Sequence, residues 1–138
     1  MKLEISSLES AIASLDRSIR GADTHASILP KDLIETVRSG IIQNFEVAYE
    51  LSWKMMKRWL EMNLSAESVD GVTRRELFRR AAESSLIADV DQWMNFHLAR
   101  NETAHTYDQE TAEEVSACAR EFLVAAQRLL SVLRERND

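Results

Sequence analysis

The scarcity of helix-breaking residues constrains the fold of this chain more than any other feature. Only three glycines and one proline occur among its 138 residues. Sandwiches and barrels need many tight turns rich in these residues, so the sequence predicts long helices instead. Apolar residues make up 45% of the chain, which is enough to fill one core. We therefore expect an all-α fold with a single helical domain over residues 1–138.

Apolar residues that recur every three or four positions predict five helices. Gly21 is expected to cap the first helix, and Thr73 and Asp108 are expected N-caps of the third and fifth. Gly40, inside the second helix, predicts either a slight kink or close packing. Short connections favour an antiparallel, up-and-down bundle. The expected helices cover residues 3–20, 31–63, 73–84, 90–104 and 109–134.

The second predicted helix has an unusually wide apolar face. Its large side chains include Trp53, Met55, Met56 and Trp59. These side chains either complete the core of one chain or form the interface of a homodimer, the commonest symmetric assembly. The sequence favours the homodimer.

The charge of the chain limits its nucleic-acid chemistry. A net charge of -6 disfavours general binding to phosphate backbones, and no DNA binding is expected. RNA remains possible in a locally basic cleft. Arginines at positions 74, 75, 79 and 80 form a basic run on the third predicted helix. This run is either a solvated face or a surface for RNA or an acidic partner.

The cysteine and histidine content predicts neither a disulfide nor a metal site. Cys118 is the only cysteine, which fits a reducing cytoplasm, and it reads as a small core residue rather than a nucleophile. The spacing of His25, His97 and His105 does not form a ligand set. The N-terminus does not resemble a signal peptide, and no segment is apolar enough to cross a membrane. We therefore expect a cytoplasmic protein.

The stretch "ARNETAHTYD", residues 99–108, gathers polar side chains that could carry chemistry. RNA cleavage without a metal needs a base for the ribose 2′-hydroxyl, an acid for the departing 5′-oxygen and a cation for the phosphorane. Arg100 offers fixed cationic donors, and a histidine such as His105 ordinarily titrates at about pH 6.5. The same residues also fit the polar end of a helix. These residues alone leave both interpretations open.

Helical geometry separates the two charged members of this stretch. Arg100 and His105 are five residues apart, which is about 500° of rotation and leaves them about 140° apart on one helix. His97, Asn101 and His105 instead share one face, as a polar ladder, with a place near the core as the alternative for His97. Arg100 and His105 can therefore converge in two ways. Either the helix ends before His105, or the motif meets a copy from a second subunit.

Three segments of the chain carry a family resemblance. "ARNETAHTYDQETAEEV" resembles the R-N-x-x-x-H-x-Y motif of the HEPN superfamily, the higher eukaryotes and prokaryotes nucleotide-binding domain. "NFEVAYELSWKMMKRWLE" and "DGVTRRELFRRAAESSLI" are similar to the nucleotidyltransferase substrate-binding branch of that superfamily. The resemblance covers about residues 1–136 and shows no departure within the motif.

This resemblance implies a five-helix HEPN bundle that dimerises through the helices near the R-x4-H motif. It implies the toxin of a HEPN–MNT toxin–antitoxin pair, a metal-independent ribonuclease that acts on RNA. Arg100 and His105 would be catalytic and Asn101 supporting. The cognate MNT-type nucleotidyltransferase, the antitoxin, would transfer AMP from ATP onto Tyr107. ATP and Mg²⁺ belong to that partner, and no cofactor is expected in this chain.

Two other functions remain open for the same residues. The first is a non-catalytic subunit that presents a nucleotide or substrate to a nucleotidyltransferase. The second is a helical adaptor without chemistry. The RNA target, the number of AMP units on Tyr107 and the face that meets the partner do not follow from the sequence.

Overall fold

Helices account for nearly all of the computed structural model, which describes residues 2–137. The all-α prediction is confirmed, with five α-helices and, in the described residues, no strand. Two short 3-10 turns, η1 (Ala66–Ser68) and η2 (Thr103–His105), lie in the connections. The α-helices are α1 (Ser6–Thr24), α2 (Lys31–Asn63), α3 (Arg74–Glu83), α4 (Val90–Glu102) and α5 (Gln109–Glu135).

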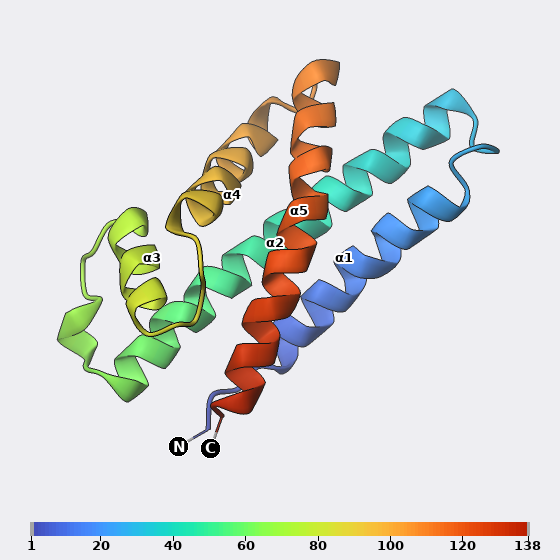
Figure 1. The fold of residues 1–138 in the computed structure, drawn as a ribbon. Coiled ribbons are helices and arrows are strands. Elements are labelled where there is room, and N and C mark those ends of the chain that lie inside the picture. Colours follow the sequence, from blue (N-terminus) through green and yellow to red (C-terminus); the bar gives the residue numbers. More distant parts are fainter. Residues whose placement is uncertain (1, 138) are drawn as a thin grey trace.

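The long helices form the body of the molecule (Figure 1). α1 and α2 run antiparallel as the most extensive pair, and α5 packs against both of them. The shorter α4 packs against α5 and α2, and α3 packs against α4 and α2. The polar stretch of residues 99–108 therefore lies at one end of the bundle, where α4 passes into α5.

An aromatic cluster around Phe122 joins α2, α4 and α5. The Phe122 ring centroid lies 5.2 Å from those of Phe45 and Phe96 and 5.7 Å from that of Trp93, all in edge-on geometry. The Tyr49 ring completes the cluster at 6.3 Å from Phe122. Each of these buried side chains stabilises the fold by about 1.5–3 kcal/mol through area alone. The cluster fixes how α4 sits on α2, and thereby which side chains meet between them.

The first helix differs from its predicted bounds. It begins at Ser6, after a non-helical segment in which Leu3 and Ile5 are buried. The Asn137 side chain accepts from the Leu3 N–H and donates to the Leu3 carbonyl, which brings the two ends of the chain together (Figure 1). Gly21 is not the cap, because the helix continues to Thr24.

The other helix boundaries follow the sequence closely. α2 has the predicted bounds. The Thr73 hydroxyl accepts from the Glu76 N–H at the start of α3, and the Asp108 carboxylate accepts from the Thr111 N–H at the start of α5. These bonds satisfy donors that a helix N-terminus leaves free. A Cβ at Gly40 would meet nothing within 4 Å, so close packing inside this chain does not explain that glycine.

The large side chains of α2 are mostly used within the chain. Met56 is buried in the core, and Trp53, Met55 and Trp59 are half-buried against it. These side chains therefore complete the core of one chain. The homodimer predicted from them stays a prediction.

Two further observations bear on the sequence analysis. Cys118 is half-buried against the core, and burial raises the pKa of its thiol to about 11, so the thiolate is scarce at neutral pH. Among the described helices, none combines the length and apolarity that crossing a bilayer requires.

Candidate active site

The polar stretch does not continue as one helix. α4 ends at Glu102, two residues before the predicted end, and His105 lies in the turn η2. The Thr103 hydroxyl donates to the Arg100 carbonyl at 2.7 Å and so occupies an acceptor of the last helical turn. The α-helix thus stops before the histidine, as one of the two expected routes to convergence requires, but this does not bring Arg100 and His105 into contact within the chain.

Arg100 is held by two carboxylates from α2. Its Nη1 lies 3.6 Å from Glu46 Oε2, and its Nε lies 3.3 Å from Glu50 Oε1. The Nε contact is an ion pair without hydrogen-bond geometry, because Nε is buried and makes no hydrogen bond. Nη1 also donates to the Thr103 hydroxyl at 3.0 Å. The side chain is 33% exposed, so its guanidinium is oriented and still reachable from solvent.

The other members of the motif lie on the surface. Asn101 and His105 are exposed, and the Tyr107 side chain is 87% exposed. The His105 and Tyr107 rings approach edge-on, with centroids 6.1 Å apart. The Tyr107 hydroxyl makes no hydrogen bond to the described residues, whereas Asp108 caps the next helix. Capping of the helix junction is thus the task of Asp108.

His97 leaves the predicted polar ladder and turns toward the core. Its Nδ1 lies 2.9 Å from the Tyr49 hydroxyl. Burial lowers the pKa of the imidazole, and the positive charge of Arg74 lowers it further. Burial also raises the pKa of the Tyr49 phenol. Both shifts favour the neutral forms, so the two groups share a hydrogen bond without charge, and the pair serves as a partly buried link between α2 and α4.

The structure brings the motif residues to one end of the bundle without joining Arg100 to His105. Among residues 2–137, no hydrogen bond or ion pair connects these two side chains. Sequence reasoning missed Glu46 and Glu50, although a signal was present. The two glutamates are i and i+4, lie on either side of Tyr49 in the sequence and share one face of α2.

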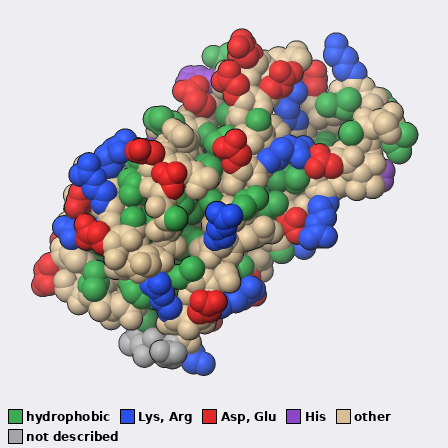
Figure 2. Space-filling view, viewed as in Figure 1, with side chains coloured by type: hydrophobic (Ala, Val, Ile, Leu, Met, Phe, Trp, Pro, Cys, Tyr) green, Lys and Arg blue, Asp and Glu red, His purple; other side chains and the backbone are tan. Residues whose placement is uncertain are grey.

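Charges are distributed unevenly around this end of the molecule. Figure 2 shows Asp and Glu side chains gathered at the top, over the start of α5, and Lys and Arg side chains at the left, over α3. The exposed acidic residues near the motif are Glu102, Asp108, Glu110, Glu113 and Glu114.

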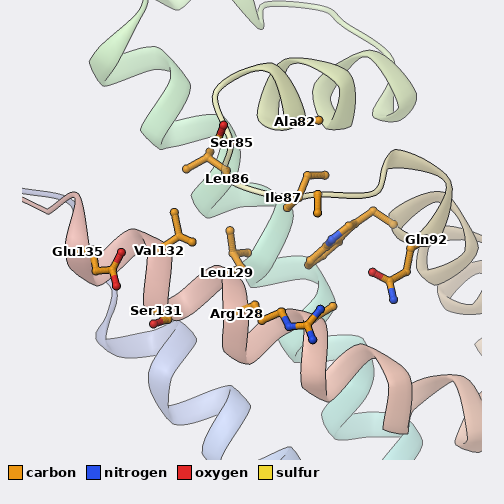
Figure 3. Close-up of a pocket in the computed structure, with 13 residues that line it drawn as sticks. Ala82, Ser85, Leu86, Ile87, Gln92, Arg128, Leu129, Ser131, Val132 and Glu135 are labelled. Atoms are coloured by element: carbon orange, nitrogen blue, oxygen red, sulfur yellow. The ribbon is translucent and has the colours of Figure 1, made fainter.

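A hollow elsewhere in the molecule holds no comparable chemistry. It measures about 610 Å³ and lies between the α3–α4 connection and α5 (Figure 3). Leu129 and Val132 of α5 point toward Leu86 and Ile87, so its lining is largely apolar. Arg128 is the one guanidinium that lines it. Charged and polar side chains gathered in one place indicate a functional site better than the volume of a hollow does. We therefore place the candidate site at Arg100 and His105.

Comparisons with known proteins match nearly the whole chain. The sequence model of the family described as "Nucleotidyltransferase substrate binding protein like" matches residues 3–135. A Haemophilus influenzae protein named "Probable ribonuclease HepT" is 35% identical over 140 residues, which cover 99% of this chain and 96% of that protein.

Solved structures agree with this match. One from Haemophilus influenzae, described as the fold of a substrate binding domain of a nucleotidyltransferase, has a TM-score of 0.90 at 34% identity. The comparison covers 95% of this chain and 99% of that one. A structure from Thermus thermophilus shares the fold, with a TM-score of 0.72 at 24% identity over 92% of this chain and 98% of that one.

The matched residues include all five helices and the motif. The resemblance drawn from the R-N-x-x-x-H-x-Y motif and from the segments of α2 and α3 is thereby confirmed. The chain belongs to the nucleotidyltransferase substrate binding protein-like family, a branch of the HEPN superfamily.

Proposed function

We propose that this protein is the toxin of a HEPN–MNT pair, a metal-independent ribonuclease whose site forms where two R-x4-H motifs meet in a homodimer. One observation carries the proposal: Arg100 is oriented by Glu46 and Glu50 at the same end of the bundle as the exposed His105. The 35% identity to a protein named a probable ribonuclease supports the same reading.

The chemistry assigns a separate task to each group. A base removes the proton from the ribose 2′-hydroxyl, and its oxygen attacks the adjacent phosphorus. An acid protonates the departing 5′-oxygen, which leaves a cyclic phosphate on one product and a hydroxyl on the other. Arg100 stabilises the charge of the phosphorane. Each chain contributes one exposed histidine to this end of the bundle, so two subunits supply His105 as both base and acid.

Tyr107 provides a means of control in this proposal. Its hydroxyl is exposed and free of hydrogen bonds to the described residues, which suits attack on the α-phosphate of ATP. A base of the partner nucleotidyltransferase takes the phenol proton, the phenol oxygen forms the new bond to the α-phosphorus, and pyrophosphate leaves with the Mg²⁺ that the partner supplies. The AMP phosphate would then stand two residues from His105, where it repels RNA and competes for Arg100.

The second candidate function is a non-catalytic subunit that presents a nucleotide or substrate to a nucleotidyltransferase. The description of the matched family and that of the similar Haemophilus influenzae structure favour it. Under this reading Arg100 binds a phosphate without any bond being cut. Expression of the chain alone separates the two functions, because growth arrest that depends on His105 supports only the toxin.

Cleavage in the presence of EDTA tests the ribonuclease directly. Unmodified protein, confirmed as dimeric by light scattering, is incubated with tRNA and mRNA. Arg100→Ala and His105→Ala are each expected to lose at least about 100-fold in rate, the smallest usual contribution of a positioned acid–base group. The absence of cleavage by the intact dimer would overturn the ribonuclease.

Mixing wild-type and His105→Ala subunits tests the shared site. When equal amounts of the two exchange freely, about a quarter of the dimers are wild type and about half are mixed. A site that needs one His105 from each subunit, as base and as acid, is intact only in the wild-type dimers. About a quarter of the wild-type activity should therefore remain. Retention of about half would mean that each subunit cleaves RNA with its own His105 and would overturn the shared site.

Intact mass after coexpression with the partner tests Tyr107. The mass of the chain is expected to rise by whole AMP units, and the mass of Tyr107→Phe should not rise. Tyr49→Phe is the control, because it removes a buried phenol and keeps the exposed one. A mass shift that persists in Tyr107→Phe would exclude Tyr107 as the acceptor.

A further inference from the structure

The basic run of α3 is not uniform in the structure. Arg74 alone stacks on an aromatic ring, with its guanidinium carbon 3.4 Å from the ring centroid of Trp53 on α2. The other three arginines of the run are held by carboxylates, in the ion pairs Arg75–Asp91, Arg79–Glu76 and Arg80–Glu76. Those three arginines therefore fit a solvated face of the helix. The stacked position of Arg74 needs another explanation.

The stack leaves Arg74 with unused donors. Its Nε is buried without a hydrogen-bond partner, and within residues 2–137 no carboxylate pairs with it. A guanidinium that stacks on an indole is oriented in advance, and its N–H groups remain in the plane to meet a phosphate. Arg74 thus resembles a prepared phosphate ligand more than a solvated charge.

Three further cations of α2 lie beside the same ring. Lys54, Lys57 and Arg58 line a shallow hollow of about 600 Å³ together with Trp53. The Lys54 Nζ lies 5.7 Å from the Trp53 ring centroid. Among the described residues, none of these three cations forms an ion pair. Glu61 is the one carboxylate that lines the hollow.

This basic surface is continuous with the candidate active site. Glu50 connects the two, because one of its oxygens accepts from the Trp53 indole N–H at 3.1 Å and the other lies 3.3 Å from Arg100 Nε. Glu50, Trp53 and Lys57 are i, i+3 and i+7, so they follow one face of α2. The path from Glu50 to Lys57 is about 10 Å long at the rise of an α-helix.

We propose that Lys54, Lys57, Arg58 and Arg74, arranged around Trp53, bind the backbone of a single-stranded RNA segment that leads to Arg100. Single strands are held by grooves that combine cations with an aromatic platform, which is the composition of this surface. The surface would also give a chain of net charge -6 a place for RNA, since four cations without a carboxylate partner among the described residues gather around one indole ring. The inference rests on the proposed ribonuclease and names the path of its substrate.

Binding of a labelled single-stranded RNA of mixed sequence tests this path. Lys57→Gln/Arg58→Gln is compared with Arg17→Gln/Lys31→Gln, which removes the same charges from unpaired, exposed positions on α1 and the start of α2. All proteins carry His105→Ala so that the RNA stays intact. Fluorescence anisotropy is recorded at several salt concentrations, and thermal unfolding verifies that each variant is folded.

The α2 variant is expected to bind several-fold more weakly at about 0.1 M salt. The slope of log K against log salt should fall in magnitude by about 1.4, because two phosphate contacts with a single strand are lost. The Arg17→Gln/Lys31→Gln control should match the His105→Ala parent. Equal losses of RNA affinity in both variants, or no loss in the α2 variant, would overturn the proposed RNA path. Unchanged RNA binding would instead favour an acidic protein as the partner of this surface.

A parallel cleavage assay uses the same proteins without the His105→Ala substitution. It separates this inference from the proposed function. Cleavage by the wild type, combined with unchanged binding by Lys57→Gln/Arg58→Gln, would overturn the path alone. Loss of binding by that variant, combined with no cleavage by the wild type, would overturn the ribonuclease and support an RNA-binding surface.

Discussion

The two halves of the R-x4-H motif are held very differently. Arg100 lies at the end of α4, half-buried, with carboxylates of α2 on two of its nitrogens. His105 lies in the turn η2, exposed, and its side chain makes no hydrogen bond or ion pair to the described residues, although its ring meets the edge of the Tyr107 ring. One chain therefore fixes the cation of the proposed site and leaves the proton-transfer group on the surface.

This difference explains why such a site would need a second subunit. Rigid placement of catalytic groups supplies much of a rate enhancement. Arg100 has that placement in the single chain, through Glu46, Glu50 and Thr103. His105 has no such support within the single chain, so the proposed site would gain it from a second subunit. In the proposed mechanism, modification of the neighbouring Tyr107 would act on this exposed half, where its 87% exposed side chain is open to a partner enzyme.

The largest expected difference in stability is between the loss of a buried aromatic side chain and the loss of an exposed one. Phe122→Ala removes the ring on which α2 and α4 pack and is expected to lower the free energy of unfolding by about 3–5 kcal/mol. Tyr107→Ala removes an aromatic side chain that is 87% exposed and should change it by less than about 0.5 kcal/mol. Urea denaturation measures both. Equal effects would contradict the assignment of Phe122 to the core and of Tyr107 to the surface.

The motif residues themselves should differ in the same direction. Arg100→Gln leaves Glu46 and Glu50 side by side without their cation and should destabilise the fold by about 1 kcal/mol, as expected for partly exposed ion pairs in a network. His105→Gln should be neutral within about 0.5 kcal/mol. Both variants should nevertheless lose RNA cleavage. A neutral Arg100→Gln would mean that the two glutamates do not hold the arginine in solution.

The hydroxyl groups at the end of α4 sharpen the comparison further. Thr103 accepts from Arg100 Nη1 and donates to the Arg100 carbonyl, whereas Thr106 makes one longer bond, 3.2 Å to the Thr103 carbonyl. Thr103→Val is expected to cost about 1 kcal/mol, the usual net worth of such hydrogen bonding, and Thr106→Val less. Denaturation of the two isosteric variants measures the difference, and the reverse order would contradict it.

The smallest expected effect is a dependence on pH. The folded pKa of His97 lies below its ordinary value of about 6.5, so the unfolded chain binds a proton more readily. Its contribution to stability is complete above about pH 6.5 and is lost as the pH falls from there through the folded pKa. His97→Gln should flatten the decline in stability between about pH 7 and 5, and His105→Gln should not. Parallel declines in all three proteins would contradict this assignment.

The sequence predicted local structure well because local structure depends on neighbours in the chain. The bounds of α2 and the caps at Thr73 and Asp108 follow from periodicity and from side chains that bond within three residues. The end of α1 was predicted wrongly, because Gly21 is compatible with a helix that continues for one more turn. The end of α4 depended on the Thr103 hydroxyl, which competes with the helical ladder.

Contacts between helices were beyond prediction from one sequence. The sequence analysis placed His97 in a polar ladder with Asn101, but the crossing of α4 over α2 turns it to Tyr49, 48 residues away. The same crossing decides that Glu46 and Glu50 hold Arg100. No spacing rule relates such residues, because the aromatic packing between the helices sets their relative rotation.

The sequence by itself determined the helical class, most helix boundaries and the motif that carries the family resemblance, since each is written in neighbouring residues. The tertiary structure decided which motif residue is held and which is exposed. It also singled out Arg74 from an otherwise carboxylate-paired basic run by stacking it on Trp53. Such distinctions arise only when helices from distant parts of the chain pack together, because packing alone determines which charges meet a partner and which remain free.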